Sequence, residues 1–271
     1  MIWTNGKRQE LIAVRDRAVQ FGDGCFTTAR IMKGKVVARA AHIGRLEEAC
    51  ERLLIAQVDW ESLQQEMDTA AATRTEGVLK VIISRGTGGR GYSASGCEAA
   101  SRILMLADYP AHYHQLRHTG VRLALSSVRL GRNPLLAGIK HLNRLEQVLI
   151  RTELEQSGAD EALVLDTQGK VVECCAANLF WRSGQRVYTP DVTQSGVNGI
   201  QRRQIMRLLA RQGIRVSEVS VPPQALEEAD EIFITNALMP VLPVSEIGNR
   251  VYGSRELFNR IGEQEDFQGN L

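Results

Sequence analysis

The stretch 137-AGIKHLNRLEQ-147 places Lys140 after two small residues and just before apolar residues at helical spacing. Ile139 and Leu142 would partly desolvate the amine, which favours its neutral, nucleophilic form and makes imine chemistry feasible. By composition alone, Lys140 is an ordinary surface lysine, because lysines are seldom buried. The residues that accompany it elsewhere in the chain decide between these interpretations.

A second stretch, 173-ECCAANLFW-181, contains Glu173 and Asn178 in an E-x-x-x-x-N arrangement. Together with Lys140 it resembles the signature of the fold type IV pyridoxal-phosphate enzymes, the family of the D-amino acid and branched-chain aminotransferases. The resemblance implies that Lys140 carries pyridoxal phosphate and that Glu173 and Asn178 bind the cofactor, with the glutamate against its ring. A carboxylate on the pyridine nitrogen keeps that nitrogen protonated, so the ring can accept an electron pair.

Two further motifs are similar to the family's phosphate-binding elements. In 42-HIGRL-46, Arg45 matches the arginine of an H-x-x-R-L motif, and a guanidinium suits phosphate oxygens. In 197-VNGIQRR-203, a glycine turn opens a helix, so the resemblance implies that the amides of Ile200 and Gln201 face the anion. Read without the resemblance, Arg45 would be a solvated charge on a helix.

A third phosphate element is implied by 235-TNALMPVLPV-244, which resembles a T-G-T-x-x-x-V-x-P-V segment of the related aminotransferases. Ala237 stands where the second threonine would be, so one hydroxyl contact is lost. Asn236 and the Ala237 amide are expected to hold the phosphate instead. This departure disfavours a standard transaminase more than it disfavours the cofactor.

Within the family, the stretches 20-QFGDGCFTTAR-30, 85-RGTGGRGYS-93 and 230-DEIFITNALMPVLPV-244 are similar to the bacterial aminodeoxychorismate lyases. The resemblance covers nearly the whole chain and fades after Glu246. It implies that 4-amino-4-deoxychorismate is the substrate and that Lys140 removes a ring proton. Pyruvate then leaves, and para-aminobenzoate is formed for folate biosynthesis.

The implied substrate is a dianion, and Arg90 and Tyr92 in the glycine-rich loop are the candidates for contacting it. They could equally be a solvated charge and a residue that packs the loop, and Arg30 and Arg132 are further candidates. The main alternative function is a D-amino acid or branched-chain aminotransferase of the same fold. An inert binding protein of this fold is disfavoured because both Lys140 and Glu173 are present.

Composition points to a globular protein with a small-molecule partner. The chain of 271 residues has 44% hydrophobic and 24% charged residues and a net charge of +2, without the basic blocks of a nucleic-acid binder. It has no signal-peptide pattern and no apolar run long enough for a membrane span. Five cysteines, an odd number without a C-x-x-C pair, favour a reducing cytoplasm and no zinc site.

Hairpins mixed with helices predict an α+β (mixed α/β) fold of two domains. We expect an N-terminal α/β domain over 1–108, a linker over 109–120 and a C-terminal α/β domain over 121–271, with the cofactor between the domains. The histidines of the linker lack acidic or cysteine co-ligands, so no metal is expected. The family resemblance also implies a homodimer.

Local patterns predict the main elements of both domains. The expected strands cover 26–32, 35–40, 78–84, 101–107, 123–128, 161–166, 178–182, 214–221 and 231–235. The expected helices cover 42–56, 142–156 and 199–213, the last ending at Gly213. A turn at Lys33-Gly34 joins the first two strands as a hairpin.

Overall fold

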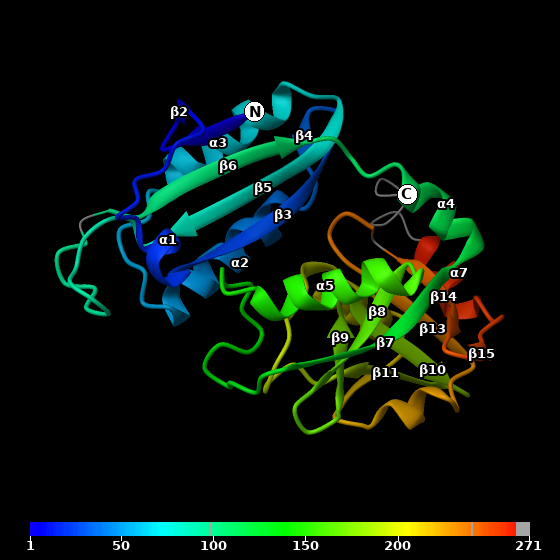
Figure 1. The fold of residues 1–271 in the computed structure, drawn as a ribbon. Coiled ribbons are helices and arrows are strands. Elements are labelled where there is room, and N and C mark those ends of the chain that lie inside the picture. The colour runs from blue at the N-terminus through cyan, green and yellow to red at the C-terminus, as the bar shows by residue number, and fades with distance from the viewer. Residues whose placement is uncertain (98, 240, 264–271) are drawn as a thin grey trace. The chain divides into compact units, whose positions relative to one another are not determined.

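The computed structural model describes residues 1–97, 99–239 and 241–263. The chain divides into two compact units. Unit 1 comprises Met1–Tyr109 and Ile139–Asn143, and unit 2 comprises Pro110–Gly138 and Arg144–Leu271. Each unit is a mixture of helices and sheet, coloured along the chain in Figure 1.

Unit 1 is built on an antiparallel six-stranded sheet with the strand order β2-β1-β6-β5-β3-β4. Figure 1 shows β6, β5 and β3 running side by side as its long central strands. The strands are β1 (Ile2–Thr4), β2 (Lys7–Arg8), β3 (Gly24–Met32), β4 (Lys35–Val36), β5 (Glu76–Ser84) and β6 (Ser101–Ala107). The helices are α1 (Arg17–Phe21), α2 (Arg39–Arg52) and α3 (Trp60–Ala72).

The hairpin predicted at Lys33-Gly34 is confirmed, with β3 paired to β4. Both turn residues have positive φ, 51° and 74°, which matches the twist of the flanking strands. The second strand is shorter than expected, since β4 ends at Val36 and α2 already begins at Arg39. Val37 and Ala38 form a turn, and the last residues of the expected strand, Arg39 and Ala40, already belong to α2.

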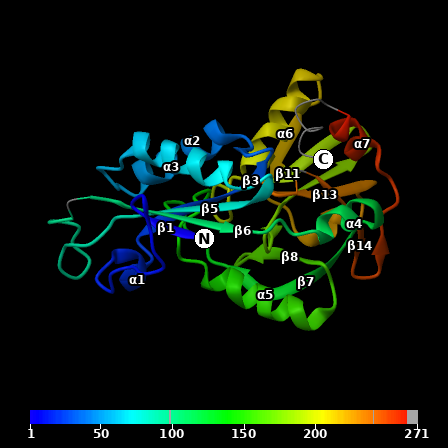
Figure 2. The ribbon, with the colours of Figure 1, turned by 90° about the horizontal axis from the view of Figure 1, so that it is seen from above.

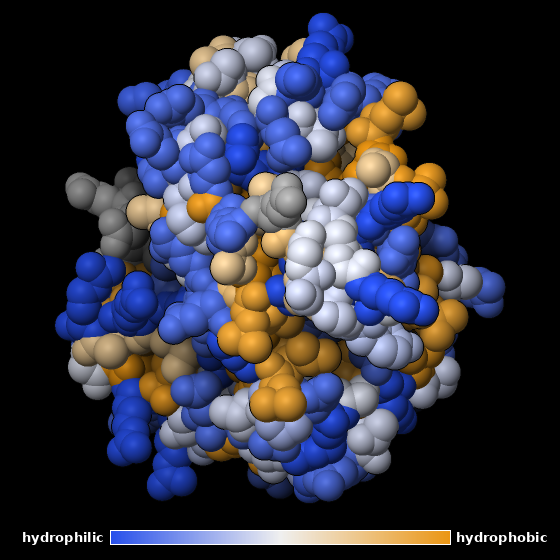
Figure 3. Space-filling view, turned by 90° about the vertical axis from the view of Figure 1, so that its left-hand side faces the viewer, coloured by the Kyte–Doolittle hydropathy of each residue, from blue (hydrophilic) through white to orange (hydrophobic). Residues whose placement is uncertain are grey.

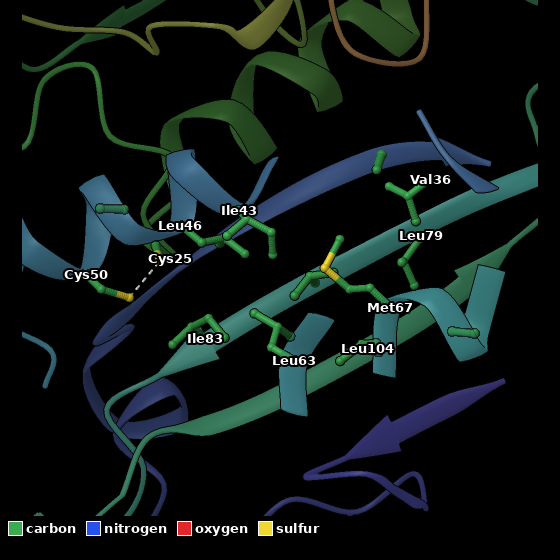
Figure 4. Packing of buried hydrophobic residues seen from close by; sticks show 14 of the residues in the cluster. Cys25, Val36, Ile43, Leu46, Cys50, Leu63, Met67, Leu79, Ile83 and Leu104 are labelled. Carbon is green, nitrogen blue, oxygen red and sulfur yellow. Dashed lines mark hydrogen bonds between the residues drawn. The ribbon is translucent and has the colours of Figure 1, made fainter. Parts of the chain in front are cut away.

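Helices α2 and α3 cover one face of this sheet, as Figure 2 shows. Every second residue of the strands points to this face, and residues three or four positions apart on the helices point back at the sheet. Both sets of side chains are buried. Figure 4 shows this packing, with Leu46 of α2 and Leu63 and Met67 of α3 directed at Leu79 and Ile83 of the sheet. The opposite face of the sheet is left free of these helices.

Unit 2 is built on a nine-stranded sheet with the order β12-β11-β10-β13-β14-β7-β8-β9, and β15 pairs with β14. Its strands are β7 (Val121–Leu130), β8 (Glu161–Asp166), β9 (Val171–Cys174), β10 (Asn178–Ser183), β11 (Arg186–Pro190), β12 (Val216–Val219), β13 (Glu231–Thr235), β14 (Leu242–Ile247) and β15 (Arg250–Val251). Its helices are α4 (His112–Thr119), α5 (Leu145–Ser157), α6 (Ile200–Arg211), the 3-10 helix η1 (Pro223–Leu226) and α7 (Glu256–Gly262). Parallel pairs β7·β8, β7·β14 and β11·β12 occur among antiparallel ones.

Two segments differ from the local pattern. The expected linker over 109–120 contains helix α4, whose Tyr113 and Leu116 pack against the core of unit 2. The helix expected from Leu142 begins only at Leu145, because residues 139–143 are extended and pair with β3. In both cases tertiary contacts decide the local conformation.

Both units bury polar as well as apolar side chains, and some large apolar side chains stay exposed. The face drawn in Figure 3 accordingly mixes hydrophobic and hydrophilic areas. Among the described residues, no helix combines the length and the apolar character that crossing a bilayer requires.

Candidate active site

Lys140 lies on a short extended segment, residues 139–143, which we call the lysine segment. It pairs with the start of β3: the N–H of Phe26 donates to the carbonyl of Lys140 at 2.9 Å, and the N–H of Leu142 donates to the carbonyl of Gly24 at 3.0 Å. At its end, the Asn143 amide donates to the carbonyl of Gly22 at 3.1 Å. The lysine is therefore held on the edge of a sheet rather than on a flexible loop.

Gly24 makes this pairing possible. A Cβ atom at residue 24 would lie 2.3 Å from the carbonyl oxygen of Ile83 and 2.8 Å from Cδ1 of Leu142. Such distances are well inside van der Waals contact. Only glycine lets β5 and the lysine segment approach β3 this closely from both sides.

The Lys140 amine points over the ring of Phe26, with Nζ 4.7 Å from the ring centroid. A second amine, Nζ of Lys80, lies 4.9 Å from the centroid of the same ring. Lys80 stands opposite Thr28 in the β3·β5 register, so it shares the face of Phe26 and Thr28, away from α2 and α3. This face therefore presents two lysine amines around one aromatic ring.

Arg45 lies on α2 and is 9% exposed. His42, one turn earlier, is buried and its Nδ1 is 2.6 Å from the Thr27 hydroxyl on β3, which fixes the helix to the sheet. Burial, and next the charge of Arg45, lower the pKa of His42 to about 3. The imidazole is therefore neutral, and Arg45 supplies the positive charge of the H-x-x-R-L motif.

Arg90 and Tyr92 lie in the glycine-rich loop of unit 1, and both are exposed. Tyr92 is 89% exposed, although its ring centroid is 5.5 Å from that of Phe21. Arg30 is instead buried, paired to Glu76 and stacked on Tyr109. Arg132, in unit 2, pairs with Asp166. Of the four candidates for substrate contact, the loop pair is the more accessible.

In unit 2, Glu173 lies on β9 and is 5% exposed. Its Oε2 accepts a hydrogen bond from the N–H of Val197 at 2.8 Å. A Cβ atom at Gly196 would lie 3.1 Å from this oxygen, so the turn before Val197 needs a glycine, which has φ 82°. The carboxylate is thus oriented by backbone. Desolvation lowers the pKa of nearby Arg144, and the charge of Glu173 opposes that shift.

Asn178, at the start of β10, positions the turn that opens α6. Its Nδ2 donates to the carbonyl of Val197 at 2.8 Å. A Cβ atom at Gly199 would lie 2.0 Å from the Asn178 Oδ1, so the turn and the amide fit only with glycine there. Gly199 is also the N-cap of α6 and has no side chain to cap the helix. The first amides of α6, at Ile200 and Gln201, therefore suit an external anion.

The third segment predicted to bind phosphate forms a turn after β13. The Asn236 Oδ1 accepts hydrogen bonds from the N–H groups of Leu238 at 2.8 Å and Met239 at 2.9 Å, and its Nδ2 donates to the carbonyl of Ala176 at 3.0 Å. The Asn236 side chain thus shapes the turn in which Ala237 lies. Pro240 of this motif is outside the described residues.

Each unit brings together part of the set predicted from the sequence. Unit 1 holds Lys140, Arg45, Arg90 and Tyr92, and unit 2 holds Glu173, Asn178, Ile200, Gln201, Asn236 and Ala237. Sequence reasoning missed Lys80, which appears as one lysine within the expected strand 78–84. Lys80 interrupts an otherwise apolar run, and this was the feature that could have revealed it, because a charged side chain within such a strand must face away from the core.

Comparison with known proteins shows the family to which the chain belongs. The sequence model of the amino-transferase class IV family matches residues 24–247. The chain belongs to the class IV aminotransferase family. The match spans both units, including the lysine segment and the turn before α6. The expected α+β architecture of fold type IV is thereby confirmed.

Class IV relatives include both lyases and aminotransferases. An aminodeoxychorismate lyase of Vibrio harveyi is 39% identical over 247 residues, 91% of each chain. A D-alanine aminotransferase of Bacillus licheniformis is 28% identical, over 92% of this chain and 89% of that one. The crystal structure of 4-amino-4-deoxychorismate lyase from Pseudomonas aeruginosa has a TM-score of 0.92 and 35% identity, covering 98% of this chain and 100% of that one.

Proposed function

We propose that this class IV protein is a pyridoxal-phosphate-dependent 4-amino-4-deoxychorismate lyase, which forms para-aminobenzoate and pyruvate. The observation that carries the proposal is the fixed position of the Lys140 amine, held by strand pairing beside a second cation, Lys80. The choice of substrate is supported by the Vibrio harveyi and Pseudomonas aeruginosa lyases, which match over nearly the whole chain. The product belongs to folate biosynthesis.

The residues present fit pyridoxal phosphate. The N–H of Val197 orients the buried Glu173 carboxylate, and α6 begins at Gly199 without a side-chain cap, so a carboxylate for the ring and free helix amides for the phosphate are both present. Lys140 would bind the aldehyde, Glu173 the ring nitrogen, and Arg45 with the Ile200 and Gln201 amides the phosphate. When bound, this cofactor stabilises negative charge on the carbon next to the substrate's nitrogen.

The remaining contributions to cofactor binding come from positioning. Asn178 holds the turn at Val197 and so sets the direction of the α6 amides. Asn236 fixes the turn that contains Ala237, whose amide would then bind the phosphate. The neutral His42 keeps α2 attached to β3 without adding a second charge beside Arg45.

We propose that Lys140 is also the base of the reaction. Its amine would take the proton from ring carbon 4 of the substrate, and the enolpyruvyl ether bond at the neighbouring carbon would break, so that enolpyruvate leaves and becomes pyruvate by taking up a proton. Lys80, on the same sheet face, would pair with a substrate carboxylate, since an ammonium attracts an anion in a partly desolvated place. Arg90 and Tyr92 are the proposed contacts to the rest of the dianion.

We further propose that the enzyme is a homodimer. Helix α5 buries Ile150 and Leu154 against unit 2 but leaves Leu145, Val148 and Leu149 exposed at 79%, 58% and 58%. The last three follow helical spacing, so they form one apolar stripe on the surface. Contiguous exposed apolar side chains mark protein contacts, and a second copy of this chain is the proposed partner.

A cytoplasmic location is proposed from the cysteine chemistry. All five cysteines carry free thiols. The sulfur atoms of Cys25 and Cys50 are 3.8 Å apart and buried in the core of unit 1, where Figure 4 shows them facing each other. A reducing compartment keeps such a pair as thiols.

The function is tested on the purified protein loaded with pyridoxal phosphate. A visible absorbance band of the lysine-bound cofactor, together with release of para-aminobenzoate from enzymatically generated 4-amino-4-deoxychorismate, supports the lyase. Conversion of that band by D-alanine or leucine, without para-aminobenzoate, would favour the aminotransferase.

The role of Glu173 is tested by Glu173→Gln. The glutamine oxygen can still accept from Val197, so the fold is retained while the charge is lost. We expect kcat to fall about 100-fold or more with the cofactor still bound, as for the loss of a preorganised electrostatic contact. A kcat close to that of the native protein would show that the carboxylate is not needed at the ring.

A further inference from the structure

Arg17, which the proposed reaction does not use, is buried at 4% exposure on the short helix α1. Its Nε donates to Oδ2 of Asp23 at 2.7 Å, so its charge is neutralised within unit 1. The Phe21 ring covers the guanidinium, with Cζ 4.8 Å from the ring centroid. A buried arginine of this kind is ordered and its donors have fixed directions.

The other donors of Arg17 are directed at the backbone of the glycine-rich loop. Nη1 donates to the carbonyls of Gly91 and Ser93, both at 3.1 Å, and Nη2 donates to the carbonyl of Tyr92 at 3.2 Å. Three consecutive carbonyls are thus bound by one planar side chain. No other side-chain type offers several donors in such a rigid fork.

The loop sequence fits this anchor. A Cβ atom at Gly89, where φ is 73°, would lie 2.0 Å from the carbonyl oxygen of Ser93 and 3.2 Å from Arg17 Nη1. At Gly88, a Cβ atom would lie 2.3 Å from the carbonyl oxygen of Gly96. The two sides of the loop therefore come close to each other and to Arg17 at positions where only glycine leaves enough space. The backbone of the loop is compact, with its two sides in close contact.

The side chains borne by this backbone point outward. Tyr92 is 89% exposed while its carbonyl is bound by Arg17, and the neighbouring Arg90 is exposed as well. An anchored backbone with exposed functional side chains lowers the entropy that ligand binding would otherwise cost.

We propose that Arg17 is a positioning residue, which fixes the backbone of residues 91–93 and thereby holds Arg90 and Tyr92 ready for the anionic substrate. The part that concerns the substrate rests on the proposed function. The part that concerns the loop rests on unit 1 alone. Arg17 is not a catalytic residue, because its donors are already used within the protein.

The chain offers a matched control in Arg85. It pairs with the same carboxylate, Asp23, at 2.7 Å, but its other donors reach the carbonyls of Leu53 and Leu54 at the end of α2. Arg85→Met therefore removes a charge from Asp23 without removing a hydrogen bond from the loop. Arg17→Met removes both.

The first test is limited trypsin digestion, because Arg90 is itself a cleavage site in the loop. Loss of several charge-assisted hydrogen bonds should raise the rate of cleavage between Arg90 and Gly91 by about tenfold or more in Arg17→Met. Arg85→Met should cleave there within about twofold of the native protein. Equal rates in the two variants would overturn the proposal.

Arg17→Lys covers the case in which Arg17→Met does not fold. Lysine keeps the charge beside Asp23 but has one donor atom, which cannot reach three carbonyls as the guanidinium does. Its cleavage rate should also rise by about tenfold. A native rate in this variant would mean that the charge alone, and not the fork, holds the loop.

The second test is a double-mutant cycle with Arg90→Gln on the cofactor-loaded enzyme. Arg17→Met should raise KM by about tenfold with the cofactor absorbance and kcat changed much less, but should add less than about twofold in the Arg90→Gln background. If the KM of the double variant rises by the full product of the two single-variant increases, Arg17 does not act through Arg90 and the proposal is overturned. If Arg90→Gln alone leaves KM unchanged, the substrate role of Arg90 fails, and the trypsin rates decide the anchoring role by themselves.

Discussion

Gly24→Ala tests whether the close pairing of the lysine segment with β3 sets the activity. The added methyl group would lie 2.3 Å from the Ile83 carbonyl oxygen and 2.8 Å from Cδ1 of Leu142. Ordinary contacts are about 3.5 Å, so the backbone must yield by about 1 Å. A misplacement of about 1 Å at a reacting group lowers the rate about 100-fold. The overpacking costs about 1 to 3 kcal/mol.

The assay is the formation of para-aminobenzoate by the cofactor-loaded variant, with thermal unfolding followed in parallel. We expect kcat/KM to fall about 100-fold and the Tm to fall by roughly 2 to 12 °C. Gly253→Ala is the control, because a Cβ atom at Gly253 meets no atom within 4 Å. If Gly24→Ala matched this control in both measurements, the close approach would not position Lys140.

Three further outcomes follow from the structure. Lys140→Ala should abolish both the lysine-bound cofactor absorbance and turnover, whereas Lys80→Met should keep the absorbance and raise KM by about tenfold; turnover in a folded Lys140→Ala protein would contradict the assignment. The pKa of His42 is about 3 rather than 6.5, because burial disfavours the imidazolium. Between pH 6.5 and about pH 3, the unfolded chain therefore binds a proton that the native chain does not. The free energy of unfolding falls by about 1.4 kcal/mol for each pH unit as the pH drops through this range. His42→Gln should remove that part of the slope in urea unfolding, and an unchanged slope would refute it. Leu149→Glu should shift the sedimentation of the protein from dimer to monomer, while Val251→Glu, at a position 72% exposed, should not.

A candidate site could be proposed from the sequence where a motif combines unusual residue types at a fixed spacing. Lys140 and Glu173 were proposed in this way, and the structure adds how each is held: one by strand pairing, the other by the N–H of Val197. Neither contact could be read from spacing, because the partners lie far away along the chain. Lys80 was missed for the same reason, since its neighbour Phe26 is set by the register of β3 on β5.

By itself, the sequence determined the elements whose patterns are local. Alternation and turn residues defined the β3·β4 hairpin, and the helical spacing of Ile205, Leu208 and Leu209 defined α6, because both depend on residues a few positions apart. Only the tertiary structure decided that residues 112–119 form a helix and that 139–143 form a strand-like segment. These segments are weakly patterned, so their conformation follows from what they pack against: the core of unit 2 for the first, and β3 for the second.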